Sequence, residues 1–249
     1  MNSILNFPAF KSGCPAPELT FDTFVVGNSN REAFFAAKSV SVNPGSLLVL
    51  CGGSGVGKTH LLHAIHATLL TQNPVATVKH MNADEFTGYL IHSIRTGNPD
   101  LFREECETAD ALLVDDVQYL SGKERTQEEF FRFLKTRFQA NRPIILTLDC
   151  SFEDARSIES SLRSSFPGIV WVTIEEPDYE VRTGIVRTKA AELELKLSEE
   201  EIDLIVEHIP GGLRNIHGVL NRINLYHSFP EAFPDAPSIS EIIRDASQN

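Results

Sequence analysis

Residues 47–59 of this 249-residue chain read LLVLCGGSGVGKT, and this stretch decides the fold. The run from Leu47 to Cys51 is continuously apolar, as in a central strand of a parallel sheet that is covered on both faces. Gly52 to Thr59 then matches the pattern G-x-x-x-x-G-K-[ST] in full, and residues 58–72 follow as a predicted amphipathic helix. A strand, this loop and a helix in direct succession predict a phosphate-binding loop for a nucleoside triphosphate.

The pattern of the loop predicts what its residues do. Glycines let backbone N–H groups turn inward around the phosphates, where side chains would clash. Lys58 is expected to reach the β- and γ-phosphates, and the Thr59 hydroxyl is expected to ligate Mg²⁺. The expected cofactors are therefore ATP or ADP with Mg²⁺. The predicted phosphate-binding residues are Gly53, Ser54, Gly55, Val56, Gly57, Lys58 and Thr59.

A second apolar strand carries the acids that such a site needs. Residues 111–116 read ALLVDD, and in phosphate-loop proteins the acid that ends such a strand holds the magnesium shell. We assign this metal-binding role to Asp115. The next acid, Asp116, is expected to orient or deprotonate the attacking water. Lys58 and Asp116 are thus candidate catalytic residues.

Short apolar runs alternate with amphipathic segments up to Pro177, which predicts an α/β fold with a parallel sheet. The expected strands are 47–51, 77–82, 111–115, 143–148 and 169–174. The expected helices between them are 58–72, 84–96, 126–140 and 152–157. After Pro177 we expect helices over 178–195, 198–209, 213–229 and 238–246, the second with a capping box formed by Ser198 and Glu201.

The same pattern predicts three regions along the chain. A flexible tail is expected over residues 1–17, a nucleotide-binding core over 18–177 and a helical lid subdomain over 178–249. The tail contains the apolar residues Ile4, Leu5, Phe7 and Phe10. These either pack against the surface of the domain or dock to a partner protein.

Composition excludes several classes of protein. A net charge of −12 opposes non-specific attraction to nucleic acid. No apolar run is long enough to span a bilayer, and the start MNSILNFPAF lacks the basic region of a secretory signal. We therefore expect a cytoplasmic protein without membrane contact. The cysteines Cys14, Cys51, Cys106 and Cys150 show no C-x-x-C spacing and are expected to be reduced thiols.

Three histidines, His60, His63 and His66, recur every third residue after the loop. In a helix with about 3.6 residues per turn they drift around the axis instead of stacking on one face. A zinc site needs well-directed ligands and usually a fourth group. We therefore expect structural or exposed histidines and no zinc site.

Five stretches carry a resemblance to a known family. They read LTFDTFVVGNSN at 19–30, GGSGVGKTHLLHAI at 52–65, LLVDDVQYLSGKERTQEEFF at 112–131, IILTLD at 144–149 and LRNIHGVLNR at 213–222. Together they resemble the AAA+ ATPase domain of the bacterial DnaA replication initiators, and the stretch at 112–131 is the most specific of them. The resemblance extends over about residues 19–246.

This resemblance implies a fold and a binding mode for the nucleotide. The fold would be a three-layer αβα core of the phosphate-loop AAA+ type, with a five-stranded parallel sheet and a small all-helical lid after it. Val26 and Gly27 would lie at the adenine, and His60 would belong to the same nucleotide site.

The resemblance also implies roles for residues far from the loop. Asp149 is expected near the γ-phosphate as a further catalytic residue, and Arg214 is expected to reach the nucleotide from the lid. Lys123 and Arg125 match a basic pair that faces single-stranded DNA in the family. In this acidic chain they are equally well explained as two solvated charges, so single-stranded DNA is only a weak candidate partner.

The chain departs from the family pattern where an arginine finger is expected. The family reads roughly E-D-R-L-x-S-R-F, whereas residues 159–166 read ESSLRSSF. Ser161 and Ser165 stand at the two arginine positions. Arg163 would point elsewhere, because each residue turns a helix by about 100°. Since an arginine finger accelerates hydrolysis by orders of magnitude, we expect a slow ATPase at most.

We therefore predict an ATP-binding DnaA-family protein that acts in or regulates the initiation of bacterial DNA replication. It would associate with DnaA or another replication protein in a nucleotide-dependent way, as a homo- or hetero-oligomer through the AAA+ interface. Its layout is similar to that of the stand-alone regulator Hda, and no sequence-specific duplex DNA-binding domain is expected. Two alternatives stay open: a helicase-loader-like ATPase of the DnaC or IstB kind, and a nucleotide-dependent interaction module that does not hydrolyse ATP.

Overall fold

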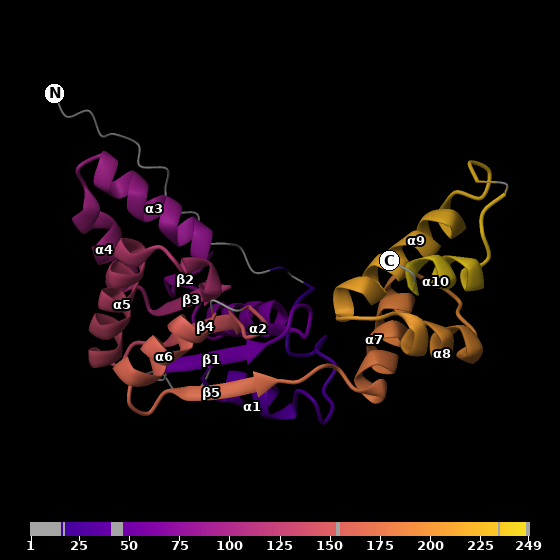
Figure 1. The fold of residues 1–249 in the computed structure, drawn as a ribbon, viewed down its shortest axis with the longest axis horizontal. Helices are drawn as coiled ribbons and strands as arrows, with labels where there is room; N and C mark the ends of the chain where they lie inside the picture. The colour runs from indigo at the N-terminus through magenta and orange to yellow at the C-terminus, as the bar shows by residue number, and fades with distance from the viewer. Residues whose placement is uncertain (1–15, 17, 41–46, 153–154, 234, 248–249) are drawn as a thin grey trace. The chain divides into compact units, whose positions relative to one another are not determined.

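Five strands form one sheet. They are β1 (Leu47–Gly52), β2 (Val78–Asn82), β3 (Ala111–Asp115), β4 (Ile144–Asp149) and β5 (Val170–Ile174). Their order in the sheet is β2-β3-β4-β1-β5, as Figure 1 shows in the computed structural model, which describes residues 16, 18–40, 47–152, 155–233 and 235–247. β1 pairs with β4, β4 with β3 and β3 with β2, each in parallel. The predicted α/β fold with a five-stranded parallel sheet is confirmed.

The strands form where apolar runs can be buried on both faces of the sheet. Every residue of β1, β3 and β4 is buried, as expected for central strands of a covered parallel sheet. β5 lies at the edge of the sheet and buries only Val172 and Ile174. Each strand lies within two residues of its predicted bounds.

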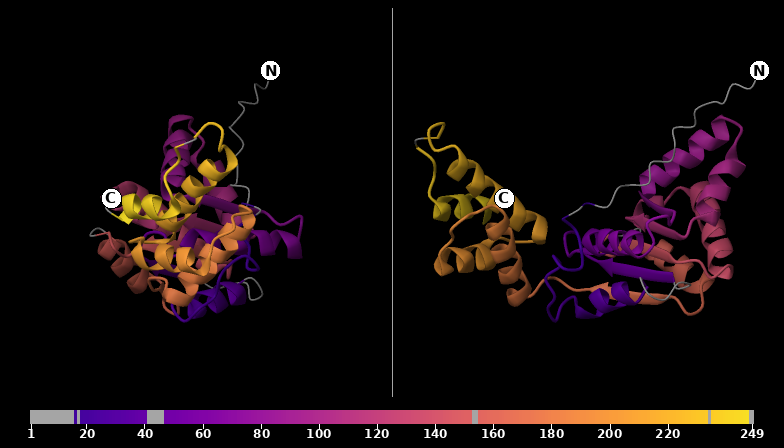
Figure 2. Two further views of the ribbon diagram at one scale, coloured as in Figure 1. Left: turned by 90° about the vertical axis from the view of Figure 1, so that its right-hand side faces the viewer. Right: turned by 180° about the vertical axis from the view of Figure 1, so that it is seen from behind.

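Helices cover the sheet on two sides (Figure 2). On one side Val49, Val114 and Leu146 share a core with the apolar faces of α3 (Ala83–Arg95), α4 (Pro99–Thr108), α5 (Glu124–Gln139) and α6 (Ala155–Ser165). On the other side of the sheet, α2 (Lys58–Gln72) contacts β1 to β4. Because side chains alternate between the two faces of a strand, α2 covers the strand residues that point away from the first core. This layering leaves the carboxyl ends of the strands as the place where loops and polar residues gather.

Sequence reasoning missed two helices and shortened a third. α1 (Arg31–Val40) and α4 were not predicted, and α4 buries only Phe102 and Cys106. α6 was predicted to end at residue 157 but continues to Ser165. Serine is a weaker helix former than alanine or leucine, so the serine-rich run masked a helix that Ile158 and Leu162 anchor in the core.

The chain divides into two compact units that interleave along the sequence. The first comprises Met1–Phe24, Glu32–Gly52 and Lys58–Thr173, and the second comprises Val25–Arg31, Gly53–Gly57 and Ile174–Asn249. The phosphate loop thus belongs to the second unit, whereas Lys58 and Thr59 belong to the first. Of the predicted tail, only Ala16 is among the described residues.

Four helices build most of the second unit. They are α7 (Tyr179–Glu192), α8 (Glu199–His208), α9 (Leu213–Ser228) and α10 (Ile239–Ser247). Val186, Ile205, Ile216, Leu220 and Ile242 share one apolar core. Ser198 accepts from the Glu201 N–H, and the Glu201 side chain accepts from the Ser198 N–H, so the predicted capping box is confirmed. No helix among the described residues is long and apolar enough to cross a membrane.

The expectation of reduced thiols is wrong for two of the four cysteines. Cys51 on β1 and Cys150, directly after β4, form a disulfide with Cα atoms 6.0 Å apart, a usual separation for such a bond. The two residues are 99 positions apart in sequence, and only the pairing of β1 with β4 brings them together. Cys106 is a free, buried thiol whose pKa burial raises to about 12. Cys14 lies outside the described residues.

One buried guanidinium holds three segments of the first unit together. Arg137 of α5 is fully buried, and its Nη1 donates to the carbonyls of Cys106 and Ala109 at 2.7 and 2.9 Å. Its Nη2 donates to the Pro143 carbonyl just before β4 at 3.0 Å. The residue therefore closes the carboxyl end of α4 and fixes the start of β4.

We expect Arg137→Met to lower the free energy of unfolding by about 1–3 kcal/mol, because the buried Cys106 carbonyl loses its guanidinium donor. The Ala109 and Pro143 carbonyls each keep a second donor, which is Arg142 Nη1 for the first and the Leu112 N–H for the second. Urea unfolding of the full chain measures this change. Arg132→Met on the exposed face of the same helix is the matched control, and a change of about 0.5 kcal/mol or less is expected there. Equal effects of the two substitutions would contradict the role given to Arg137.

Candidate functional site

Hydrogen bonds join the predicted metal residues at the carboxyl ends of the strands. The Thr59 hydroxyl at the start of α2 donates to Asp115 Oδ2 at 2.8 Å. The buried hydroxyl of Thr147 on β4 donates to Asp115 Oδ1. Asp115 thus has both carboxylate oxygens engaged, by hydroxyls from α2 and β4.

Burial dominates the electrostatics of Asp115. Burial raises the pKa of this carboxyl above its ordinary value, and the charge of Asp116 acts in the same direction. The Thr147 and Thr59 hydroxyls and the Lys58 ammonium act against it, because each favours the ionised form. Bringing a cation to this carboxylate would offset its desolvation.

Lys58 lies folded against the end of the sheet. Its side chain is 6% exposed, its Nζ donates to the Gly52 carbonyl at 2.8 Å, and the same atom lies 4.0 Å from Asp149 Oδ2. The strand register places Gly52 opposite Asp149. Asp149 Oδ1 also accepts from the backbone N–H of Ser151 at 3.0 Å. The predicted catalytic residues Lys58 and Asp149 therefore meet.

Asp116 sits in a turn that few residues adopt. Its φ of 57° and ψ of 49° lie in the left-handed region, which Asp visits more readily than most residues other than Gly. Its N–H donates to the Thr147 hydroxyl at 2.8 Å, and its Oδ1 accepts from Gln118 Nε2 at 2.9 Å. Sequence reasoning missed both Thr147 and Gln118, although both lie within stretches that carried the resemblance.

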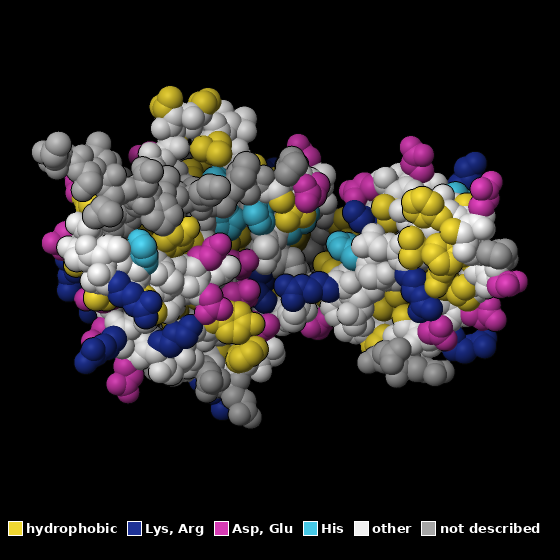
Figure 3. All heavy atoms as spheres, turned by 90° about the horizontal axis from the view of Figure 1, so that it is seen from above, with side chains coloured by type: hydrophobic (Ala, Val, Ile, Leu, Met, Phe, Trp, Pro, Cys, Tyr) yellow, Lys and Arg dark blue, Asp and Glu magenta, His cyan; other side chains and the backbone are white. Residues whose placement is uncertain are grey.

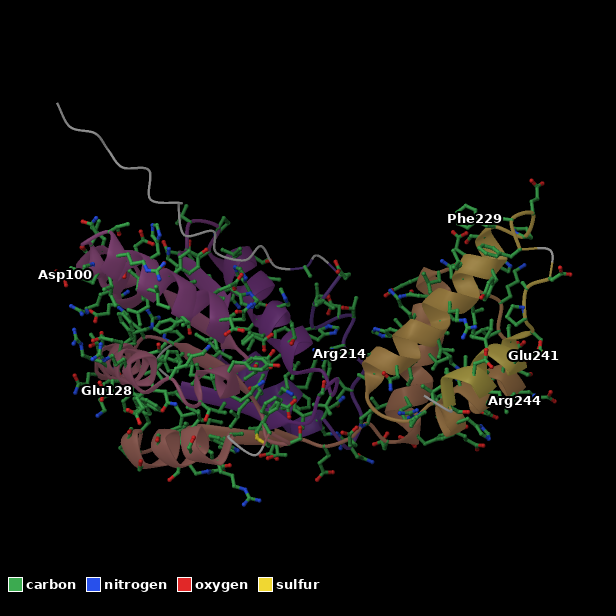
Figure 4. The ribbon with its side chains drawn as sticks, turned by 45° about the horizontal axis from the view of Figure 1, so that its top comes forward. Asp100, Glu128, Arg214, Phe229, Glu241 and Arg244 are labelled. Carbon is green, nitrogen blue, oxygen red and sulfur yellow. A yellow bond between two sulfur atoms is a disulfide. The ribbon has the colours of Figure 1, made fainter. Side chains whose placement is uncertain are left out.

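The phosphate loop and Arg214 meet inside the second unit. The Leu213 N–H at the start of α9 donates to the Gly55 carbonyl at 3.1 Å, and Arg214 Nη1 donates to Ser54 Oγ at 3.0 Å. Figure 4 shows Arg214 at this end of α9. Gly55 has a φ of 76°, and a Cβ there would lie 3.3 Å from the backbone of Gly212. Gly53, Val56 and Gly57 complete the loop.

The residues predicted at the adenine are in the second unit. Gly27 donates its N–H to Asn30 Oδ1 at 2.9 Å, and a Cβ at Gly27 would come within 2.3 Å of Val181 Cγ2 on α7. Glycine is therefore required for this close approach. The neighbouring Val26 is 40% exposed, so an apolar surface is available beside it.

His60 is placed differently from the rest of the predicted nucleotide site. Its Nε2 lies 2.8 Å from the Thr20 carbonyl, and its ring packs edge-on against Phe24 at 5.1 Å. These contacts tie α2 to the segment before Val25. The structure gives His60 a role in anchoring that segment, and its predicted contact with the nucleotide stays a prediction.

The other two histidines of α2, the half-buried His63 and the buried His66, form a cluster with a buried histidine that the sequence pattern did not single out. His66 Nδ1 lies 3.2 Å from Nδ1 of His80 on β2, and the His63 ring lies 4.6 Å from the His80 ring. Figure 3 shows histidine side chains gathered on one face of the first unit. Among the described residues no group of three or more His, Cys, Asp or Glu side chains is arranged to hold a metal.

Two of the basic residues considered in the sequence, Lys123 and Arg163, have local partners. Lys123 Nζ pairs with Asp84 Oδ1 of α3 at 2.9 Å, while Arg125 is exposed in the first turn of α5. Arg163 donates to Glu159 at 2.9 Å, and its guanidinium lies 4.1 Å over the Trp171 ring. Arg163 is thus held against its own unit.

Residues 16–172 match the family model described as the bacterial DnaA ATPase domain. The chain is 39% identical over 221 residues to the chromosomal replication initiator protein DnaA of Chloroflexus aurantiacus. That match covers 88% of this chain and 46% of the relative. The chain therefore spans less than half the length of this curated relative.

Solved structures show the same likeness in three dimensions. Domain III from the Thermotoga maritima replication initiation protein DnaA has a TM-score of 0.81 at 30% identity, covering 94% of this chain and 98% of that one. A replication initiator DnaA bound to AMPPCP and single-stranded DNA has a TM-score of 0.77 at 33% identity, covering 88% of this chain and 69% of that one. The likeness thus extends over most of the chain.

Protonation of the buried histidines is expected to destabilise the protein at mildly acidic pH. Burial lowers the pKa of His66 to about 4 and that of His80 to about 3, well below the ordinary 6.5. Between pH 6.5 and these lowered values, the unfolded chain binds protons that the folded chain excludes. The stability contributed by the neutral histidines is fully present above pH 6.5 and is lost as the pH falls toward those lowered values.

We expect His80→Gln to lower the slope of the unfolding free energy against pH between about pH 7 and 5. The number of protons taken up on unfolding should fall by up to about one. Urea unfolding at a series of pH values measures the slope. His92→Gln, on the exposed face of α3, should keep the wild-type slope. An unchanged slope in His80→Gln would show that the cluster does not exclude protons.

Proposed function

The chain belongs to the bacterial DnaA ATPase domain family, and from this premise we propose that it binds ATP with Mg²⁺ as a nucleotide-dependent partner in the initiation of bacterial DNA replication. One observation carries the nucleotide site. The motif Gly52–Thr59 leads directly into a helix whose first residues, Lys58 and Thr59, contact Asp149 and Asp115. The chain thus supplies a lysine for the phosphates and a hydroxyl and a carboxylate for the metal.

The oxygen donors around Asp115 suit magnesium. Mg²⁺ prefers hard oxygen ligands and is usually held through one or two carboxylates together with phosphates and water. Thr59 Oγ1 and Asp115 Oδ2, 2.8 Å apart, would hold the ion and its water shell. When bound, the ion would neutralise negative charge on the phosphates.

The second unit supplies donors for the phosphates. The loop of Gly53–Gly57 offers backbone N–H groups, and Arg214 is held beside it through Ser54. A guanidinium has five N–H donors in a planar fork, which suits phosphate oxygens. We assign Arg214 to the phosphate end of the nucleotide, and Val26 and Gly27 to the adenine end.

The described geometry favours slow turnover. Asp116 directly follows Asp115, its carboxylate accepts from Gln118, and it would accept the proton of the attacking water. An arginine that one subunit inserts into the active site of its neighbour would accelerate this step. At the two positions where the family has arginines, this chain has Ser161 and Ser165 on α6. Arg163 does not replace them, because Glu159 and Trp171 engage its side chain.

The absence of an arginine at positions 161 and 165 favours a regulatory role over a self-assembling one. A subunit that binds ATP but gives no arginine to the next site can join an assembly of initiator subunits and end it. The match of residues 16–172 to the DnaA family favours DnaA as the partner over a replicative helicase. Single-stranded DNA, which is bound in one related structure, is a secondary partner here because Lys123 is already paired with Asp84. We place this function in the cytoplasm.

We expect Lys58→Gln to weaken ATP binding by about tenfold or more, because a charge-assisted hydrogen bond to phosphate contributes about 1.5–3 kcal/mol. Calorimetric titration with ATP and Mg²⁺ measures the affinity. Lys135→Ala, on the exposed side of α5, is the matched control and should bind as wild type does. Wild-type affinity in Lys58→Gln would contradict the assignment of the loop.

The partner is tested by mixing the chain with a bacterial DnaA initiator and ATP. We expect shorter initiator filaments in proportion to the amount of added chain, measured by electron microscopy and light scattering. The Lys58→Gln variant should shorten them far less, because joining requires bound ATP. If filament length and ATP hydrolysis by the initiator both stay unchanged, the regulatory proposal fails while the nucleotide site is unaffected.

A further inference from the structure

Gln118 links two predicted catalytic residues that come from different strands. It lies two residues after Asp116, in the short 3-10 turn η1 (Val117–Leu120), and is only 3% exposed. Its Nε2 donates to Asp116 Oδ1 at 2.9 Å, and its Oε1 accepts from the backbone N–H of Asp149 at 2.9 Å. One side-chain amide therefore spans the ends of β3 and β4.

The two partners fix the orientation of this amide. Asp116 Oδ1 can only accept unless the acid is protonated, and a backbone N–H can only donate. Turning the amide over would set oxygen against oxygen and N–H against N–H, and both contacts would be lost in a buried place. Only one orientation of the Gln118 amide therefore makes both hydrogen bonds. Through this amide the positions of Asp116 and Asp149 are linked.

A parallel link runs through Thr147. Its hydroxyl accepts from the Asp116 N–H and donates to Asp115, so the backbone of the turn is already fixed to β4. Gln118 adds what Thr147 does not: it holds the carboxylate of Asp116 and the backbone of Asp149 together. Because Lys58 Nζ lies 4.0 Å from Asp149 Oδ2, the position of Asp149 also bears on the lysine that phosphate-loop chemistry places at the γ-phosphate.

We propose that Gln118 is a positioning residue that couples Asp116 to Asp149 and so supports the discrimination of ATP from ADP. This inference rests on the proposed nucleotide site. ADP lacks the γ-phosphate, so its binding depends on the loop, on Lys58 through the β-phosphate and on the adenine end. ATP in addition meets the end of the site where Lys58, Asp116 and Asp149 gather.

The test compares affinities for ATP and ADP, each with Mg²⁺, in the full chain. Gln118→Met keeps the length of the side chain and removes both hydrogen bonds. We expect its ratio of ATP to ADP affinity to fall by about tenfold, with the affinity for ADP within about threefold of wild type. A purely structural role would weaken both nucleotides alike. Gln127→Met is the matched control, because Gln127 donates its amide to the Leu120 carbonyl at the other end of the turn.

Thermal unfolding of each variant shows whether it is folded. If Gln118→Met does not fold, Gln118→Asn replaces it, since an asparagine is one methylene too short to reach both partners, and the same selective loss is expected. Equal losses for the two nucleotides, or an unchanged ratio, would overturn the role of Gln118. A wild-type chain that binds neither nucleotide would instead refute the proposed function itself.

Discussion

Parallel pairing of β4 with β1 on one side and β3 on the other is the constraint on which the candidate site depends. The register sets Gly52 opposite Asp149 and Val114 opposite Leu146, so β1 and β4 end level with each other and β3 ends two residues earlier. The start of the loop, the acids Asp115 and Asp116, and Asp149 then share one edge of the sheet. A shift by one residue would turn every side chain to the opposite face, which would bury the acids in the apolar core.

Polar groups at this edge are stable because they satisfy one another. Thr147 is fully buried, yet its hydroxyl both donates and accepts, and Gln118 uses both ends of its amide. Buried polar groups without partners would cost several kcal/mol, whereas a satisfied network also fixes geometry. The left-handed backbone of Asp116, which is seldom favourable, is held by the same bonds.

Much of the fold follows from patterns within short stretches of sequence. Short β-rich runs, most of them nearly continuous in apolar residues, located all five strands, and the loop motif located the start of α2 at Lys58. What depends on contacts between distant segments could not be derived in this way. Thr147 and Gln118 gain their roles only from the cross-strand register, and the disulfide of Cys51 and Cys150 only from the adjacency of β1 and β4. α4 was missed because so little of it is buried.

A crystal structure of the chain with AMPPCP and Mg²⁺ would show whether this edge of the sheet holds a triphosphate. We expect the β- and γ-phosphates to lie against the backbone N–H groups of residues 53–59, with Lys58 Nζ turned from the Gly52 carbonyl toward them. The metal should be bound by the Thr59 hydroxyl, with Asp115 in its shell. A nucleotide bound elsewhere, or a loop that stays empty at saturating concentration, would contradict the account.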